Sequence, residues 1–352
     1  MNYTYILTVF IMAFFVAFLL TPLVKKLAIK LNAIDVPNDK RRIHDHPIPR
    51  LGGLAIVAGF TISTLLYGFL VNKTSDNIFD LQLLGLFLGI IVIEVVGVLD
   101  DIYQLKAWQK LIFQILAAVI VVNCGTKIEF FTNPLNDEYI FFGVWSAPIT
   151  ILWIVGITNA INFIDGLDGL AAGVASISAL SLLFISIFLG NAEIVVLAAS
   201  LAGATLGFLP FNFNPAKIFM GDTGSTFLGF TLGTIAIMGM IKSYTVISVV
   251  APLIVFGLPI FDTAFAILRR IAKGQSPMVA DRGHLHHRLV DAGLSQRQTV
   301  LILYLISTCL GIMGFLLTQG GIIRVVLLFV ALMIFIIAGQ KIVSDMNKSE
   351  KN

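Results

Sequence analysis

Apolar stretches of about 20 residues recur along the whole of this 352-residue chain. An α-helix of about that length crosses the hydrocarbon core of a bilayer. Only 12% of the residues are charged, whereas a soluble domain carries about 25%. The pattern predicts an all-α polytopic membrane protein and excludes a soluble globular fold.

We expect a bundle of about 11 transmembrane helices that forms a single integral membrane domain over residues 1–352. The fourth, fifth and eighth spans are short for a complete crossing, which indicates broken helices or polar loops within the membrane. The first run follows an uncharged MNYTY segment and lacks a small-residue cleavage site, so we expect it to be retained as a helix. The predicted spans are 3–24, 52–71, 81–99, 107–123, 144–161, 169–190, 193–211, 226–241, 245–265, 299–318 and 322–340.

The basic residues favour one side of this bundle. Counted with the adjoining helix ends, the connections on that side and the C-terminal tail hold 19 of the 23 Lys and Arg residues. Basic loops mark the cytoplasmic side, so the N-terminus should lie outside and the C-terminus inside. All five His residues and most loop Asp residues fall on the same side, where we expect the chemistry. The connections concerned are 25–51, 100–106, 162–168, 212–225 and 266–298.

Two adjacent carboxylates, Asp100 and Asp101, end an apolar helix in the segment GVLDDIYQLK. Like charges at a membrane edge are costly unless a cation balances them. Two hard oxygen ligands with phosphates nearby are a usual way to hold Mg²⁺. The alternative is a solvated helix end, in which one Asp pairs with Lys106 or Lys110.

The segment NAINFIDGLDGL carries Asn159, Asn162, Asp165 and Asp168 with no basic residue. The spacing of three would place both acids on one face of a helical turn. A functional interpretation is a polar pocket for the hydrogen-bonding groups of a substrate. The alternative is a capped turn between two spans, because Asn, Asp and Gly are common helix-capping residues.

The segment FMGDTGS places Asp222 between glycines at the start of a span, with hydroxyl residues following it. Helix N-termini with small residues expose free N–H groups that bind anions. An Asp in that position can hold a metal ion against a phosphate. Helix capping alone is the competing explanation.

A late loop contains DRGHLHHR, in which His284, His286 and His287 lie beside Arg282 and Arg288. Imidazole and guanidinium groups donate hydrogen bonds that suit a diphosphate. The cluster could instead bind zinc, although no further His or Cys accompanies it. A plain basic cytoplasmic loop is a third explanation.

An early loop reads DKRRIHDHPIPRLGG and includes His44 and Arg50. It is dense in cations and imidazoles, and two prolines stiffen it. Recruitment of a phosphorylated lipid or a nucleotide is one interpretation, and contact with anionic lipid is the other. Together, the motifs favour Mg²⁺-dependent phosphoryl chemistry at the membrane surface, because phosphoryl transfer depends mainly on positioning and charge neutralisation.

The order of these motifs resembles the polyprenyl-phosphate N-acetylhexosamine-1-phosphate transferases. The resemblance rests on DD, NxxNFxDGxDGL, FMGDTGS and HLHH, and it covers most of the chain. The RxIHxxPxPRxGG segment is similar to the branch that initiates enterobacterial common antigen, O-antigen and teichoic acid. Arg288 after HLHH favours UDP-GlcNAc as donor over UDP-MurNAc-pentapeptide.

The resemblance implies transfer of GlcNAc-1-phosphate from UDP-GlcNAc to undecaprenyl phosphate, which releases UMP. It also implies Mg²⁺, with Mn²⁺ as a substitute, and a multi-pass protein of the bacterial plasma membrane with its active site on the cytoplasmic face. A homodimer is compatible with the family, and nucleic acid is not an expected partner. The product would begin a cell-surface glycopolymer.

By the same resemblance, Asp100, Asp101 and Asp222 are the expected catalytic residues, and Asp222 and Asp101 the expected metal ligands. Relatives place a Lys four residues after the first Asp, where this chain has Gln104; Lys110 is our choice for the phosphate contact. The expected substrate-binding residues are Asn159, Asn162, Asp165, Asp168, Lys110, Arg282, His284, His286, His287, His44 and Arg50.

Two alternatives remain at this stage. The first is a UDP-MurNAc-pentapeptide phosphotransferase, which differs in its donor. The second is an ion-coupled transporter, because transporters also keep acidic residues near broken helices. Transporter sites lie near the middle of the bilayer between structural repeats, whereas these acids cluster at one rim and no repeat is visible.

Overall fold

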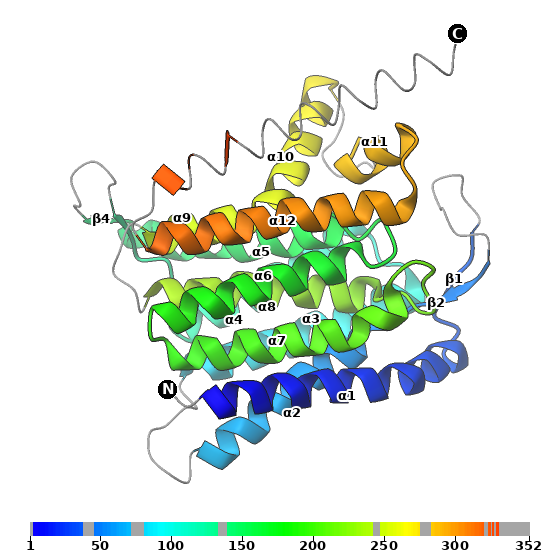
Figure 1. Cartoon of the computed structure of the whole chain (residues 1–352), viewed down its shortest axis with the longest axis horizontal. Helices are drawn as coiled ribbons and strands as arrows, with labels where there is room; N and C mark the ends of the chain where they lie inside the picture. The colour runs from blue at the N-terminus through cyan, green and yellow to red at the C-terminus, as the bar shows by residue number, and fades with distance from the viewer. Residues whose placement is uncertain are drawn as a thin grey trace.

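The protein is a bundle of helices whose long axes run roughly along one direction (Figure 1). This computed structural model describes residues 3–37, 46–71, 81–132, 139–241, 247–274 and 283–319, and the single residues 323, 324, 326, 329 and 330. The helices are α1 (Tyr3–Lys30), α2 (Gly53–Val71), α3 (Leu81–Tyr103), α4 (Ala107–Asn123), α5 (Ser146–Phe163), α6 (Leu170–Phe188), α7 (Ala192–Asn212), α8 (Gly221–Ile241), α9 (Ile247–Val255), α10 (Gly257–Ala272), α11 (Leu285–Asp291) and α12 (Gln296–Thr318).

Helix α8 is the centre of the bundle, because it packs against α2, α3, α5, α6 and α7. Helices α1, α7, α6 and α12 lie side by side in front of it (Figure 1). Helices α6 and α7 bury runs of Ala, Ser and Gly, and small residues let membrane helices approach closely. Because α8 packs against so many helices, its first turn lies among the ends of several of them.

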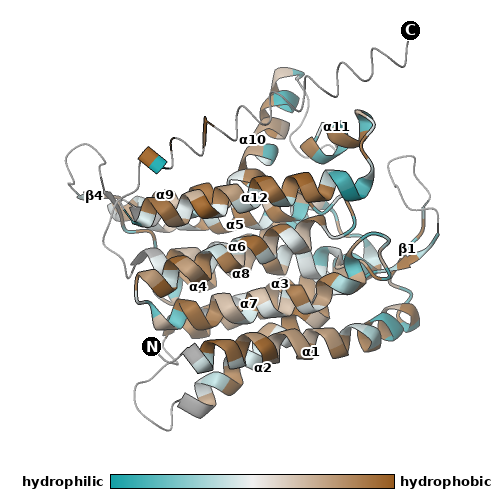
Figure 2. Ribbon diagram, in the orientation of Figure 1, coloured by the Kyte–Doolittle hydropathy of each residue, from teal (hydrophilic) through white to brown (hydrophobic). Residues whose placement is uncertain are grey.

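Six of the described helical segments are long and apolar enough to cross a membrane, by length and composition. They are α1, α3, α6, α7, α12 and the segment Gly143–Phe163, which joins the short 3₁₀ helix Gly143–Trp145 to α5. Helices α2 and α4 are shorter apolar helices. Figure 2 shows apolar helix bodies, with polar residues gathered where α1 ends and α12 begins. The chain is therefore a multi-pass membrane protein, and its orientation remains a prediction.

Most predicted spans coincide with a helix, but three boundaries were wrong. Helix α1 continues to Lys30 rather than residue 24, and α3 continues to Tyr103, so the adjacent acids belong to its last turns. Helix α8 begins at Gly221, not at residue 226. Polar residues at these ends continue the helical hydrogen-bonding pattern, which hydropathy alone does not detect. The predicted span 322–340 lies almost wholly outside the described residues.

The predicted span 245–265 is two helices, α9 and α10, which meet at Val255 and Gly257. Helix α10 leaves the bundle at an angle (Figure 1). It carries apolar residues along one side and ends in basic residues. Breaks were instead expected in the fourth, fifth and eighth spans, where the structure has the continuous helices α4, α5 and α8.

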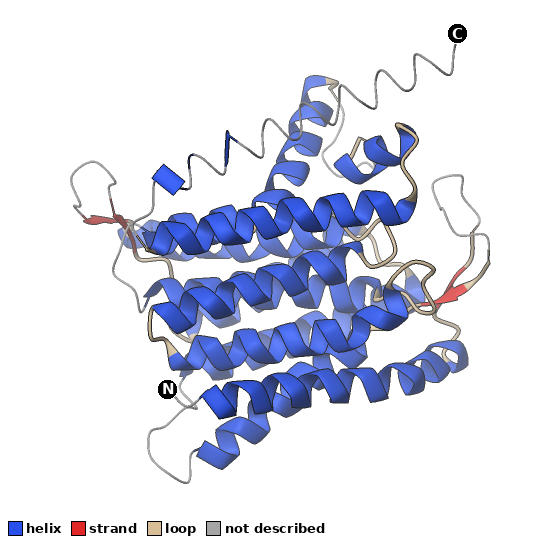
Figure 3. Ribbon diagram, in the orientation of Figure 1, coloured by secondary structure: helices blue, strands red, loops and turns tan. Residues whose placement is uncertain are grey.

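Two short antiparallel strand pairs interrupt the predicted all-α fold (Figure 3). Strand β1 (Ile34–Asp35) pairs with β2 (Ile48–Pro49), and β3 (Phe130–Thr132) pairs with β4 (Tyr139–Phe141). Both pairs lie in connections, at opposite ends of the bundle (Figure 1). The first pair brings Pro49 beside Phe219, whose N–H donates to the Pro49 carbonyl at 2.8 Å.

Candidate active site

A polar cavity of about 280 Å³ lies where α3 ends and α8 begins. The turn between α5 and α6, the β1–β2 segment and the first turn of α11 form much of its wall. Five carboxylates and one guanidinium share this wall with a single imidazole. Its lining includes Asp35, Arg50, Asp101, Asp165, Asp168, Asp222 and His287. Motifs from five separate parts of the sequence therefore meet in one place.

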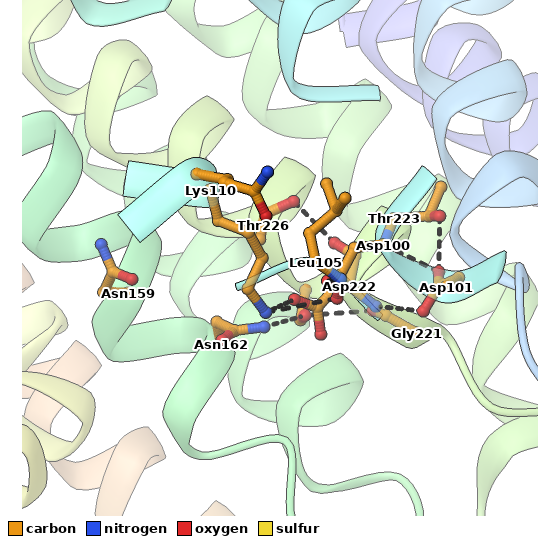
Figure 4. A network of polar contacts seen from close by, with 12 residues as sticks. Asp100, Asp101, Leu105, Lys110, Asn159, Asn162, Gly221, Asp222, Thr223 and Thr226 are labelled. Atoms are coloured by element: carbon orange, nitrogen blue, oxygen red, sulfur yellow. Dashed lines mark hydrogen bonds and ion pairs between the residues drawn. The ribbon is translucent and has the colours of Figure 1, made fainter. Parts of the chain in front are cut away.

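Lys110 joins two of the predicted catalytic acids (Figure 4). Its Nζ lies 2.6 Å from Asp222 Oδ2 and 3.2 Å from Asp100 Oδ2. The other oxygen of Asp100 accepts the N–H of Leu105 at 2.7 Å, which fixes the connection between α3 and α4. Asp100 is only 6% exposed, so this cation offsets a buried negative charge. The pairing of Asp100 with Lys110 was expected for the alternative of a helix end, but that end is buried rather than solvated. The contact of Lys110 with a phosphate remains a prediction.

Asp101 holds the N-terminus of α8. Its Oδ1 accepts the N–H of Asp222 at 2.9 Å, and its Oδ2 accepts the N–H and hydroxyl of Thr223 at 3.1 and 2.6 Å. Helix N-termini leave N–H groups without intrahelical partners, and here a neighbouring helix supplies the acceptors. Gly221 adopts a left-handed φ of 70°, and a Cβ there would lie 2.2 Å from Asp101 Oδ2. Only glycine permits this approach.

Asp222 lies between two different spaces. On one side it lines the polar cavity. On the other it lines a narrow crevice between α3, α4 and α8, where Lys110 and Thr226 meet apolar residues such as Val96 and Phe113. Asp222 therefore faces the polar cavity and also this crevice, which at about 10 Å³ has room for about one water molecule.

Asp165 contrasts with these acids, because its carboxylate makes no hydrogen bond to any described residue although it lines the cavity. Its pKa is raised to about 8, first by burial and then by the negative charges of Asp222, Asp101 and Asp168, while Arg50 opposes the rise. Asp165 and the acids around it carry more negative charge than the described residues balance. A bound cation would stabilise such a group of carboxylates.

Asp168 fastens two loops together. Its Oδ2 accepts the Asn214 side-chain N–H and the Ala216 backbone N–H, both at 3.0 Å. The residues between α5 and α6 form turns rather than a helix, so the expectation that Asp165 and Asp168 share a helical face was wrong. Gly169, with φ of 80°, is the N-cap that precedes α6. Both acids nevertheless line the cavity.

The two asparagines of the same motif lie outside the cavity wall. Asn162 donates to Ser225 Oγ at 2.8 Å and so connects α5 to the first turn of α8. Asn159 donates to Gln114 Oε1 at 2.7 Å and lies apart from the acidic cluster (Figure 4). In this structure both amides connect helices, and their contact with a substrate remains a prediction.

The histidine motif forms α11, which packs over the turn that carries Asp165. His286 is 2% exposed and lies against Gly166, where a Cβ would be 2.3 Å from its Nε2. Its pKa is lowered to about 3 by burial and by the neighbouring His287 and His284, against the opposing charge of Asp262. His286 is therefore a neutral ring beneath the cavity, whereas His287 lines it.

Arg50 reaches the cavity from the β1–β2 segment, where its guanidinium pairs with Asp35. Two other predicted basic residues, His44 and Arg282, lie outside the described residues.

Sequence reasoning missed Asp35, Thr223 and Asp262. A lone acid such as Asp262 inside an apolar span is itself a functional signal, and its position should have been noticed. Asp35 and Thr223 carry no comparable signal, because their importance comes from partners distant in sequence.

Within the described parts of the chain, no group of three or more His, Cys, Asp or Glu side chains could hold a metal ion by itself. Mg²⁺ commonly takes one or two carboxylates and completes its coordination with phosphate oxygens and water. The unpaired Asp165 and the nearby Asp222 supply such carboxylates, and the surplus negative charge favours a divalent cation. The residues therefore fit Mg²⁺ held jointly with a phosphorylated ligand.

Comparison with known proteins places this site in a family. Residues 83–240 match the model of glycosyl transferase family 4. A probable undecaprenyl-phosphate N-acetylglucosaminyl 1-phosphate transferase of Bacillus subtilis is 40% identical over 94% of this chain and 90% of its own. A decaprenyl-phosphate N-acetylglucosaminephosphotransferase of Mycolicibacterium smegmatis is 34% identical over 82% of this chain and 76% of its own.

A phospho-N-acetylmuramoyl-pentapeptide-transferase of Halalkalibacterium halodurans is also similar, at 30% identity over 74% of this chain and 80% of its own. The named relatives are all transferases, so the transporter alternative is set aside. Their similarity extends over most of the chain. The chain belongs to glycosyl transferase family 4, the enzymes that its motifs resemble.

Proposed function

We propose that this enzyme transfers GlcNAc-1-phosphate from UDP-GlcNAc to undecaprenyl phosphate, giving undecaprenyl-diphosphate-GlcNAc and UMP. The observation that carries the proposal is Asp222, which lines the polar cavity and also lies 2.6 Å from the Nζ of Lys110. A nucleotide sugar bound in this acidic cavity, with a metal ion, would place its diphosphate beside the pair. The relatives named for N-acetylglucosamine support this donor.

In the proposed reaction, an oxygen of the lipid phosphate attacks the β-phosphorus of UDP-GlcNAc. The bond between that phosphorus and the oxygen bridging to the α-phosphate breaks, and UMP leaves with its electron pair. A lipid phosphate is already anionic near neutral pH, so the attack requires positioning rather than a strong base. We therefore favour direct attack over an aspartyl-phosphate intermediate.

The residues take distinct roles in this proposal. Lys110 binds the lipid phosphate and offsets the charge of Asp100 and Asp222. Arg50 and His287 bind the donor from the cavity side. Asp101 positions Asp222 by holding the start of α8. Charge stabilisation by prearranged groups is commonly the largest contribution to catalysis of this kind.

The geometry leads us to a different pair of metal ligands from the pair expected from the sequence, Asp222 and Asp101. We propose Asp222 and Asp165 as the carboxylates that hold Mg²⁺. Both oxygens of Asp101 already accept hydrogen bonds from α8, so we assign it to positioning rather than to the metal. When bound, Mg²⁺ supplies positive charge to the diphosphate and its leaving oxygen.

We further propose that the site faces the cytoplasm, because the basic connections gather at the same end of the bundle. UDP-sugars are made in the cytoplasm, which agrees with that orientation. The product would be the first lipid-linked sugar of a cell-surface glycopolymer. A homodimer remains a prediction.

The test is UMP release by the purified protein with UDP-GlcNAc, undecaprenyl phosphate and Mg²⁺. We expect release that requires lipid and metal and falls by about 10²–10³-fold in Asp222→Asn. Asp291→Asn, an exposed acid on α11, is the matched control and should be unchanged. Turnover of UDP-MurNAc-pentapeptide alone would replace the donor, and no turnover of any UDP-sugar by folded protein would refute the proposal.

A further inference from the structure

A buried acid on α10 contacts the first residues of α11, which also packs against α12. Asp262 Oδ2 lies 2.8 Å from His284 Nδ1, and its Oδ1 accepts the backbone N–H of Leu285 at 2.7 Å. The two side chains are 7% and 8% exposed. A carboxylate that is largely removed from water is costly unless its partners satisfy it, and these two contacts do so.

The contact determines which nitrogen of His284 carries the proton. An ionised carboxylate can only accept hydrogen bonds, so the short contact requires the proton on Nδ1. Nε2 is then the ring atom left for a ligand, and it has no hydrogen-bond partner among the described residues. The partner of one ring nitrogen sets the role of the other.

The orientation of His284 is transmitted to the other two imidazoles. The rings of His284 and His286 are nearly parallel, at 9°, with centroids 5.7 Å apart. His286 lies against Gly166 in the turn that carries Asp165, and the ring of His287 is 4.3 Å from that of His286. His287 lines the polar cavity. A shift at His284 would therefore move the imidazole at the cavity.

We propose that Asp262 is a positioning residue of the active site, which sets the Nδ1–H tautomer of His284 and docks α11 over the cavity. It acts through the histidines, since it is not among the residues that line the cavity. The effect that we expect of Asp262 on turnover rests on the proposed transferase function. The state of the His284 ring can be measured separately.

The decisive variant is Asp262→Asn, because it retains shape but changes the hydrogen-bonding groups. The amide oxygen can still accept the Leu285 N–H, and the amide nitrogen then faces His284 Nδ1 as a donor. The ring must give up its Nδ1 proton and take the Nε2–H tautomer. A purely structural role would survive this exchange, because the helix keeps its cap.

The experiment combines ¹⁵N-histidine NMR of the purified protein at pH 8 with steady-state kinetics of UMP release. His284→Gln assigns the His284 signal. We expect Nδ1–H in the wild type and Nε2–H in Asp262→Asn, together with a fall in kcat of about 10–100-fold and a smaller change in KM. Asp262→Glu, which retains the carboxylate, should restore the Nδ1–H and part of kcat.

Asp291→Asn is the matched control, since it makes the same substitution at an exposed position of α11, the helix that Asp262 contacts. It should leave both the tautomer and kcat unchanged. Retention of the Nδ1–H in Asp262→Asn would overturn the proposal, and so would a switched tautomer with wild-type kcat. If the wild type released no UMP, the proposed function would fail, while the NMR measurement would still decide whether Asp262 sets the ring.

Discussion

The cavity has two sides that use the same residue types in opposite ways. The helix-end cluster, which we define as Asp100, Asp101, Lys110 and Asp222, lies on α3, α4 and α8, where ion pairs and backbone N–H groups satisfy its oxygens. The loop rim, which we define as Arg50, Asp165, Asp168 and His287, comes from connections and from α11. It includes Asp165, whose carboxylate has no hydrogen bond to the residues that the structure describes. An acid with satisfied oxygens is positioned by the fold, whereas an unsatisfied acid in a cavity is available to a ligand.

The largest expected effect tests the helix-end cluster. Lys110→Gln removes the cation between Asp100 and Asp222. We expect UMP release to fall by about 10²–10³-fold, because two acids then lose the charge that offsets them and the lipid phosphate loses its contact. Initial rates at saturating lipid would measure the loss. Lys106→Gln, at the exposed start of α4, is the control that should keep activity within about twofold; equal losses in both variants would contradict the role of Lys110.

The second prediction tests the loop rim, where activity and stability should change in opposite directions. Asp165→Asn should lower turnover by about 10²-fold, since a metal ligand is removed. The same substitution should raise the melting temperature of metal-free protein in detergent, because it removes one of several mutually repelling carboxylates. Melting curves with and without Mg²⁺ would show both effects. A lower melting temperature without metal would mean that Asp165 is satisfied by the fold.

The third prediction returns to the helix-end cluster and concerns stability. Asp101→Asn leaves at least one N–H of the α8 N-terminus without an acceptor. We expect a loss of about 1–3 kcal/mol in unfolding free energy, the usual cost of an unsatisfied buried donor. Denaturant titration in detergent would measure it. Thr223→Val removes only the hydroxyl contact and should cost about 1 kcal/mol; a larger loss there than in Asp101→Asn would reverse the assigned roles.

The smallest expected effect is a pH dependence at the histidine helix. The pKa of His286 is lowered to about 3 in the fold, against about 6.5 in an unfolded chain. Its contribution to stability is therefore complete above pH 6.5 and is lost as the pH falls toward 3, because only the unfolded state takes up the proton. His284, His287 and Asp262 are the titratable groups that influence it.

Between pH 7.5 and 5.5, Asp165 contributes the opposite slope, because its pKa is raised to about 8. We therefore expect a difference between variants: as the pH falls, the melting temperature of His286→Gln should gain relative to that of the wild type. His46→Gln, an exposed histidine of the β1–β2 segment, should leave the slope unchanged. If both variants kept the pH dependence of the wild-type melting temperature, a titratable group other than His286 would cause that dependence.

Several features of the fold were accessible from the sequence because they depend on local composition. Ala107–Asn123 was predicted at its observed bounds, since an apolar run flanked by polar residues contains all the necessary information. The break between α9 and α10 was not located, because the run 245–265 is apolar on both sides of it. The ends of α3 and α8 were misplaced for a different reason. Their polar residues are satisfied by each other across the bundle.

In the candidate site, too, some features were accessible from the sequence and others depended on partners distant in sequence. The residue types and their order along the chain were enough to identify the acids, the histidines and the transferase family, because motifs are properties of sequence. The sequence could not separate Asp101 from Asp165, since both are aspartates at the end of an apolar run. Only the tertiary structure places three donors of α8 on the first and leaves the second without a hydrogen bond to any described residue. Hydrogen bonding depends on distance and direction in space, so helices remote in sequence decide which carboxylate serves the fold and which is left to bind a ligand.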